Sequence, residues 1–247
     1  MEERVECFCI NCGEQVNNLY KKYSETVLKL TECEYCGKIA DKYVEFDNVI
    51  VIIDLILLNT NAYRHILFNS QFKHYWKLSL ILILLEAYST MTLLNNPIKK
   101  CDRSIKAEPN LEDFDMNVED LKFYIITLNL GISFVVFNIA IFCFTWIYYQ
   151  KFSHNKSKMP SFNLIFKTIT LASTGKFLQL PSIIWDLSVY DYHLHFITLY
   201  ISLSQLLAYK VICSCPKLWC LITIFSSLTL KAMINDYLNI FLNFILK

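Results

Sequence analysis

The chain has 247 residues, of which 55% are hydrophobic and 18% are charged, whereas ordinary soluble domains contain about 45–50% apolar and about 25% charged residues. This balance predicts a membrane protein. The formal net charge of +1 gives no electrostatic reason to bind nucleic acid, and no dense Lys/Arg stripe supplies one locally, so we exclude nucleic acid as a partner.

Residues 1–48 differ from the rest of the chain because they are polar and rich in cysteine. Five of the ten cysteines lie in the first 36 residues. The segment has no apolar core of a secretory signal peptide, so we expect targeting to depend on a later membrane segment. Alternating apolar residues over 5–10, 27–30 and 43–46 predict short strands. Such a small β domain needs a staple to be stable.

Two copies of one cysteine motif supply that staple. Cys9-Ile-Asn-Cys12-Gly13 and Cys33-Glu-Tyr-Cys36-Gly37 are separated by twenty residues, which is the spacing of a four-thiolate zinc site. Four thiolates close the coordination sphere, so the predicted Zn²⁺ is structural. Disulfides or reduced thiols are the alternative, but a cytosolic location would not favour disulfides.

Residues 49–68 predict an apolar helix with a polar stripe. At 100° per residue, Asp47, Asp54, Asn61 and His65 fall on one side, and Val, Ile and Leu cover most of the rest. We expect residues 1–48 to form a zinc-ribbon domain, called the ribbon below. The helix of residues 49–68 should lie in the membrane interface, with its stripe toward water or the ribbon. Packing inside the bundle, with the stripe lining a cavity, is the alternative.

Residues 69–247 predict a helical transmembrane region of about five spans. The clearest lies within 123–150, which contains no charged residue. Residues 162–185 carry a proline and two lysines, so a span there must be kinked and its lysines must snorkel or face the interior. The expected spans are residues 78–95, 123–149, 162–185, 194–210 and 218–234.

Three ionisable residues lie within these expected spans. Burial in a membrane is costly, so Glu86, Lys167 and Lys176 are expected to pair or to line a polar path. The alternative is that the span boundaries differ and the three lie at the interface. Near the end of the fourth span, three further cysteines, Cys213, Cys215 and Cys220, could be palmitoylated or simply buried.

The positions of basic residues predict which side of the membrane each segment faces. Lys73 and Lys77, Lys151 to Lys158, and Lys210 with Lys217 flank three span ends. We expect those three sites and the N-terminus to be cytosolic. Residues 96–121 and the C-terminus would then be lumenal, although the basic residues near position 100 argue against this.

Several motifs follow the first cysteine pair. They are Leu19-Tyr20 with Tyr23, Asp41-Lys-Tyr-Val-Glu-Phe-Asp47, Asp54-Leu-Ile-Leu and Ala62-Tyr-Arg-His-Ile-Leu-Phe-Asn69. With the cysteines, these motifs of residues 9–69 resemble those of the Arv family, and beyond residue 69 the likeness is one of hydropathy alone. The resemblance implies an endoplasmic-reticulum membrane protein of sterol homeostasis, lipid transport and early glycosylphosphatidylinositol assembly.

Three functions remain open on this basis. The first is a non-enzymatic factor that binds or moves sterol or a glycolipid, in which Asp54, Asn61, Arg64 and His65 contact lipid or a partner. Arg64 suits a lipid phosphate or a carboxylate of the ribbon because it stays protonated. The second is an adaptor whose ribbon docks a partner enzyme. The third is a membrane transferase with His65 as base, which the sequence supports least because it offers no nucleophile with a base and an orienting group.

The sequence therefore predicts a mainly α-helical multi-pass membrane protein with a small N-terminal β zinc-ribbon.

Overall fold

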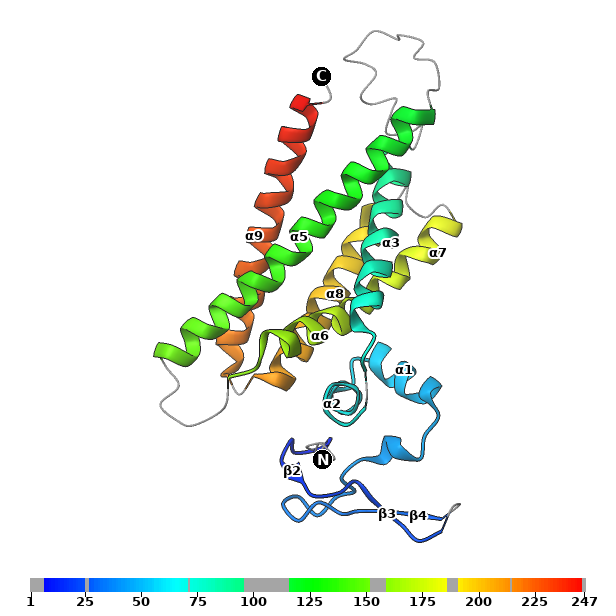
Figure 1. Ribbon diagram of the computed structural model, residues 1–247, viewed down its shortest axis with the longest axis vertical. Helices are drawn as coiled ribbons and strands as arrows, with labels where there is room; N and C mark the ends of the chain where they lie inside the picture. The colour runs from blue at the N-terminus through cyan, green and yellow to red at the C-terminus, as the bar shows by residue number, and fades with distance from the viewer. Residues whose placement is uncertain are drawn as a thin grey trace.

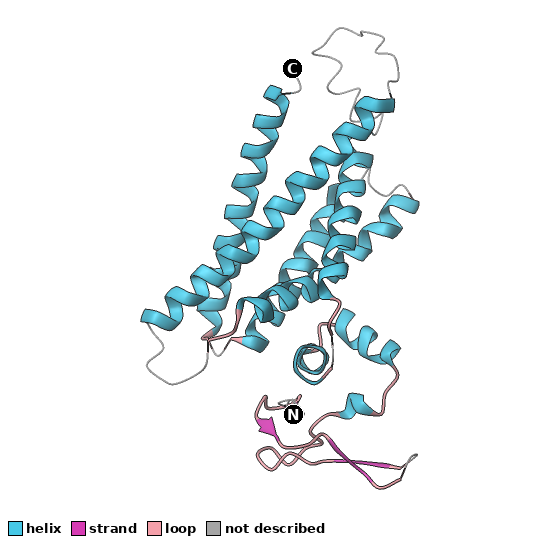
Figure 2. Ribbon diagram, in the orientation of Figure 1, coloured by secondary structure: helices cyan, strands magenta, loops and turns pink. Residues whose placement is uncertain are grey.

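The computed structural model describes residues 7–24, 27–70, 72–95, 116–151, 159–185, 191–213 and 215–245. The strands lie at one end, two short helices follow, and the long helices form a bundle at the other end (Figures 1 and 2). The expected fold class, a mainly helical membrane protein with a small N-terminal β region, is confirmed.

The N-terminal region consists of two small antiparallel sheets. In the first, β1 (Cys7–Phe8) pairs with β2 (Gln15–Val16), and in the second, β3 (Tyr20–Lys22) pairs with β4 (Leu28–Leu30). A single further bridge joins Glu32 and Ile39. Strands this short bury little, which agrees with the need for a staple.

Residues 43–46, which alternate like a strand, do not form one. Instead, Lys42–Val44 is a 3₁₀ turn that begins after Asp41. The side chain of Asp41 accepts a hydrogen bond of 2.9 Å from the backbone N–H of Tyr43. This side-chain bond offers the backbone an alternative to sheet pairing, and it fixes a turn here.

The expected continuous helix over 49–68 is broken into three pieces. They are α1 (Asn48–Ile56), α2 (Thr60–Arg64) and the π-helical turn η2 (His65–Asn69). The break lies at Leu58, whose φ is +58°, an uncommon value for a side chain of this size. Asn59 then restarts the helix, because its side chain accepts from the N–H of Asn61. The polar stripe therefore does not run along one axis.

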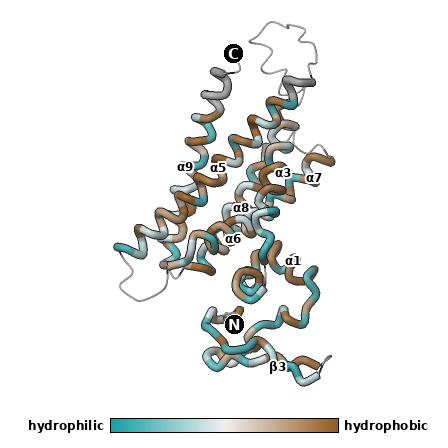
Figure 3. The backbone as a smooth tube through the Cα atoms, in the orientation of Figure 1, coloured by the Kyte–Doolittle hydropathy of each residue, from teal (hydrophilic) through white to brown (hydrophobic). Residues whose placement is uncertain are grey.

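Four long helices form the bundle. They are α3 (Tyr75–Asn95), α5 (Met116–Lys151), α8 (Asp191–Ile212) and α9 (Lys217–Ile245). Each is long and apolar enough to cross a membrane. Hydrophobic residues predominate along them, as Figure 3 shows.

The remaining expected span, 162–185, is interrupted. It consists of α6 (Phe162–Ala172), a 3₁₀ segment η3 (Ser173–Leu178) and α7 (Gln179–Ile184). Since α5 ends at the end of the bundle that faces the ribbon and α8 returns to that end, this broken segment carries the chain back along the bundle (Figure 1). Gly175 allows η3 to pack against α8, because a Cβ there would lie 2.6 Å from the Tyr200 ring.

One hydrophobic core connects the ribbon to the bundle. Ile10 of the ribbon and Tyr43 of the 3₁₀ turn pack in the same cluster as Tyr63 of α2, Leu171 of α6 and Ala208 of α8. The Tyr63 hydroxyl also lies 2.7 Å from that of Ser204 in α8. The ribbon is thus seated on the helices.

Candidate functional site

The four cysteines of the paired motifs come together at the end of the ribbon. Their sulfur atoms all lie within 4.8 Å of one another. Cys9 Sγ is 3.8 Å from Cys36 Sγ, and Cys12 Sγ is 3.7 Å from Cys33 Sγ. The four cysteines could hold one metal ion.

The two motifs have the same backbone geometry. In the first, the N–H of Gly13 donates to the carbonyl of Cys9, and in the second the N–H of Gly37 donates to that of Cys33, both at 2.9 Å. Gly13 has a φ of +85° and Gly37 a φ of +67°, values that glycine adopts without strain. Each motif is therefore a tight turn that presents two sulfur atoms on one side.

The backbone of the first cysteine motif favours the thiolate of Cys9. Burial raises the pKa of the Cys9 thiol, but hydrogen bonds from the backbone N–H groups of Cys12 and Asn11 outweigh it and lower the pKa to about 7. Burial raises the pKa of the neighbouring Cys12 thiol to about 12, as expected when one of two adjacent thiols ionises first. Such a cluster is stabilised when a cation neutralises it, and four thiolate ligands leave no open coordination position.

Arg64 supports the first cysteine motif from α2. Its Nη1 donates to the carbonyls of Ile10 at 2.8 Å and Asn11 at 2.6 Å. The guanidinium also lies 3.8 Å from where a Cβ on Gly13 would be. The structure thus gives Arg64 a contact with the ribbon backbone, and the expectation of a lipid phosphate gains no support from this geometry.

A buried carboxylate joins the ribbon to η2. The side chain of Asp41 is fully buried, and its Oδ2 accepts from Nδ1 of His65 and from Nδ2 of Asn69, both at 2.7 Å. Asn69 also exchanges two hydrogen bonds with the backbone of Phe8, at 2.9 and 2.8 Å. Because a buried charge without partners is costly, this network holds the ribbon and the turn in one arrangement.

Asp54 of α1 faces the same region, and Asn61 does not take part in these contacts. The carboxylate of Asp54 accepts from the Tyr43 hydroxyl at 2.5 Å and lies 3.8 Å from Nζ of Lys42. Asn61 is half-buried at the start of α2. The structure therefore turns Asp54 and His65 toward residues 41–43: Asp54 contacts Tyr43 and Lys42, and His65 contacts Asp41.

Within the bundle, Glu86 and Lys176 form an ion pair. Nζ of Lys176 lies 2.5 Å from Oε2 of Glu86, and Lys231 of α9 lies 3.7 Å from Oε1 of the same carboxylate. Lys167 is elsewhere, since its ammonium donates to the Leu67 carbonyl of η2 at 2.9 Å. Two of the three expected intramembrane groups thus meet, and the third links α6 to the η2 turn.

Sequence reasoning did not single out three residues of these networks. Asp41 and Asn69 stand in motifs quoted above but were given no role, and Lys231 lies within the expected span 218–234 without having been singled out. A charged residue within an apolar helix was the available signal for Lys231. Asp41 offered no local signal for this network, because the two side chains that donate to its Oδ2 lie more than twenty residues away.

The three C-terminal cysteines are buried. Cys213, Cys215 and Cys220 are at most 9% exposed, and they join the core between α5, α6, α8 and α9. The structure therefore agrees with the interpretation of these residues as packed side chains.

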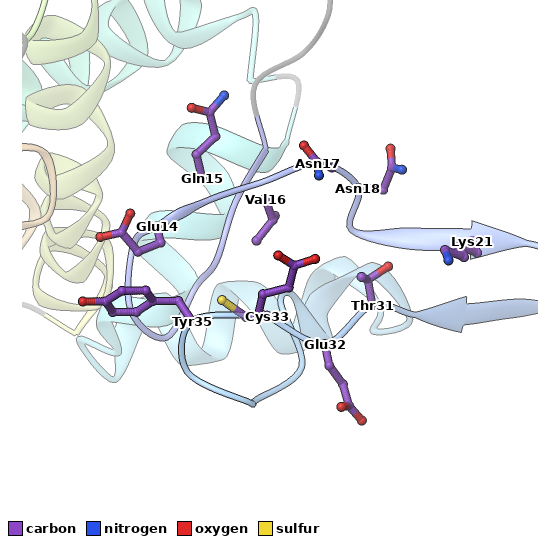
Figure 4. Close-up of a pocket in the computed structure, with 11 residues that line it drawn as sticks. Glu14, Gln15, Val16, Asn17, Asn18, Lys21, Thr31, Glu32, Cys33 and Tyr35 are labelled. Carbon is purple, nitrogen blue, oxygen red and sulfur yellow. The ribbon is translucent and has the colours of Figure 1, made fainter.

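A hollow of about 510 Å³ lies on the outer face of the ribbon, next to the cysteine cluster. Figure 4 shows the side chains around it, including Cys33 and the exposed ring of Tyr35. Its lining contains the carboxylates of Glu14, Glu32 and Glu34 but a single lysine, Lys21. The hollow is acidic.

Comparison with known proteins gives a consistent result. The model of the Arv1-like family matches residues 8–209. "Protein ARV1" of Mus musculus is 31% identical over 226 residues, which are 92% of this chain and 81% of that protein. "Protein ARV1" of Homo sapiens is 31% identical over 225 residues, which are 91% and 79% of the two chains. "Protein ARV1" of Saccharomyces cerevisiae is 52% identical over 62 residues, 25% of this chain and 19% of that protein. No solved structure matches.

Proposed function

Because this chain belongs to the Arv1-like family, we propose that it is an endoplasmic-reticulum membrane factor in sterol homeostasis and intracellular lipid transport. Handling of glycosylphosphatidylinositol intermediates is a second part of the proposal. The chain would bind or distribute lipid without catalysing a reaction. Arg64 and His65 are engaged in contacts with the ribbon, and the four clustered thiols are placed to hold a metal ion.

The observation that carries the proposal is the exposed apolar face of α1. Its side chains are 42–70% exposed although they are Val, Ile and Leu. Exposed apolar surface of this kind marks an interaction site, and the neighbouring bundle is itself apolar enough to lie in a bilayer. We propose that α1 lies in the membrane interface. The face consists of Val49, Ile50, Ile52, Ile53, Ile56 and Leu57.

We propose that the metal is Zn²⁺ and that Cys9, Cys12, Cys33 and Cys36 hold it. Four clustered sulfur ligands are typical of structural zinc. When bound, the ion supplies charge neutralisation and a cross-link between the two cysteine turns. The residues of the chain do the rest: backbone N–H groups of the turns stabilise the thiolates, and Arg64 holds the first turn against α2.

We propose that the ribbon faces the cytosol. The ends of α3, α5, α8 and α9 nearest the ribbon carry Lys77, Lys151, Lys210 and Lys217. Basic residues near span ends are retained on the cytosolic side. In intact microsomes, protease should remove an N-terminal tag, and protection of that tag would refute the orientation.

The adaptor function is the alternative, and the acidic hollow favours it. Glu14, Glu32 and Glu34 would complement a basic segment of a partner protein. Charge reversal with Glu32→Lys and Glu34→Lys should then release the partner and leave lipid binding unchanged. As a matched control, Glu45→Lys alters an exposed carboxylate outside the hollow.

Purified full-length protein in liposomes tests the main proposal. Transfer of a labelled sterol and of a labelled glycosylphosphatidylinositol precursor is measured between donor and acceptor vesicles. Acceleration of either should depend on α1, so Ile53→Ser combined with Leu57→Ser should reduce it. Transfer at the rate of protein-free vesicles for both lipids would reject transport and leave scaffolding.

A further inference from the structure

The bundle contains a small polar cavity beside η3, where the helical segment of residues 162–184 is interrupted. It has a volume of about 110 Å³. Glu86 lies about three turns from the start of α3 and Lys231 about four turns from the start of α9, which places both well within their spans. Irregular backbone at membrane depth is tolerated where it lines a cavity, and the 3₁₀ segment η3 contributes Ser173 and Lys176 to this one.

The charges around the cavity do not balance. Its lining contains the ammonium groups of Lys176 and Lys231 but one carboxylate, that of Glu86. Lys176 is 5% exposed and is 2.5 Å from Glu86, so the closest pair is compensated, while Lys231 lies 3.7 Å from the same carboxylate. One positive charge is left over. Such a charge within a membrane is costly without a counter-ion.

Two acceptor oxygens of the uncharged lining also lack donors. Gln179 and Gln205 both face the cavity, and the side-chain oxygen of each is buried without a hydrogen-bond donor among the described residues. The hydroxyls of Thr198 and Ser202 lie on the same wall. The cavity thus offers excess positive charge together with acceptors that a hydroxyl-bearing ligand would satisfy.

From these observations we propose that the cavity binds a phosphate group, and specifically the phosphodiester of an anionic phospholipid whose head group carries hydroxyls. A phosphodiester bears one negative charge, which matches the single uncompensated ammonium. The cavity is roughly the volume of four water molecules, enough for a phosphate and far below that of a sterol. Side chains of Glu86 and Lys231 are 22% and 25% exposed, so the cavity can be entered from the side of the bundle. This inference rests on the proposed lipid function and names a ligand class for it.

Retention of added lipid by the detergent-purified full chain tests the proposal, with an apparent Kd measured by native mass spectrometry. The probes are dioleoylphosphatidylglycerol, zwitterionic dioleoylphosphatidylcholine and inorganic phosphate. Phosphatidylglycerol should bind about tenfold more tightly than phosphatidylcholine. Lys231→Met should abolish that preference. The control, Lys217→Met, removes an exposed lysine from the same helix and should leave it intact.

Glu86→Gln distinguishes a ligand site from a structural ion pair. The substitution releases Lys176, so an anion site should bind phosphatidylglycerol more tightly, opposite in sign to Lys231→Met. If both variants weaken binding together with a loss of thermal stability, the cluster is structural and the proposal fails. If millimolar inorganic phosphate displaces phosphatidylglycerol, the site binds free phosphate, and the proposal of a lipid ligand fails. A negative result here leaves sterol transfer by the wild-type chain unchanged, so the two proposals fail separately.

Discussion

The ribbon and the bundle are held together by different means. The ribbon has strands of two or three residues, a cluster of four cysteines, and contacts from side chains of η2 and α2. The bundle has helices of 21–36 residues that pack along their length, with a few buried polar contacts between them. The comparison suggests that the ribbon should respond sharply to single substitutions at its links and that the bundle should respond gradually.

Loss of a sulfur ligand should give the largest effect. A structural zinc can contribute about 10 kcal/mol or more to the folding of a small domain, so Cys33→Ser should unfold the ribbon and release the metal. Metal analysis and hydrogen exchange of residues 7–24 would show this. Cys7→Ser, which alters a β1 residue outside the cluster, should keep close to one equivalent of metal. A folded, metal-free Cys33→Ser ribbon would contradict the distinction between the two regions.

Removal of the buried carboxylate should come next. Asp41→Ala leaves His65 and Asn69 without their common acceptor, so we expect a loss of about 3–5 kcal/mol in the free energy of opening the ribbon from the helices. Amide exchange in the purified chain measures that opening. Asp47→Ala, an exposed residue before α1, is the control. Equal exchange in the two variants would mean that the core around Ile10 holds the ribbon by itself.

Arg64→Ala should have a smaller effect of the same kind. It removes hydrogen bonds to two carbonyls of the first cysteine motif, which suggests a cost of about 2 kcal/mol. Amides of residues 9–13 should exchange faster while metal content stays close to one equivalent. Arg64→Lys should restore part of the protection, because the ammonium keeps the positive charge and can donate to one carbonyl. Full protection should not return, because an ammonium lacks the fixed planar geometry of the guanidinium. Unchanged exchange with altered lipid transfer would return Arg64 to the lipid-binding role expected from the sequence.

Within the bundle, close packing at η3 should tolerate little added volume. Gly175→Ala would place a Cβ 2.6 Å from the Tyr200 ring, and we expect a loss of about 1–3 kcal/mol. The hydroxyl of Tyr200 donates to the Ile56 carbonyl at 2.7 Å, so exchange at the end of α1 should also rise. Gly131→Ala, where nothing lies within 4 Å of the added Cβ, should be neutral or slightly stabilising. Thermal unfolding of the two variants in detergent compares them directly.

The smallest effect is expected on the surface of α1. Leu57 is 70% exposed, so Leu57→Ile conserves the apolar face and should change stability by less than about 0.5 kcal/mol. Thermal unfolding and flotation with liposomes should both match the wild type. A clear loss of flotation would mean that the shape of this face matters, and not its hydrophobicity alone.

Local patterns were enough to predict the cysteine cluster and the four long helices. The cysteine spacing and the length of uncharged segments each carry their own physical meaning, so the cluster of Cys9, Cys12, Cys33 and Cys36 and the apolar helices follow from nearby residues. The breaks do not. The 3₁₀ turn at Lys42–Val44 depends on one side-chain bond from Asp41, and the bend at Leu58 contradicts the usual preference of leucine.

Contacts between distant residues were beyond local reasoning for a different reason. The pairing of Glu86 with Lys176 joins positions ninety residues apart, and helical periodicity cannot say which buried charge meets which. Arg64 was expected to act at a phosphate or a carboxylate, yet its partners are backbone carbonyls, which no sequence pattern distinguishes. A general rule that buried charges find partners was correct, and the identity of the partners required the fold.

The π-helical turn η2 has a consequence for the length of the chain. A π turn closes with the N–H of Ser70 donating to the carbonyl of His65, so it contains one residue more than an α-helical turn would. Deletion of one residue between positions 65 and 69 would restore α-helical spacing and rotate everything on one side of it by about 100° relative to the other. Asp41 contacts His65 and Asn69 at the two ends of this turn, and Lys167 donates to Leu67 in its middle, so these contacts could not all survive that rotation. In genetic terms, a single-codon deletion here should be more damaging than most substitutions at the same positions.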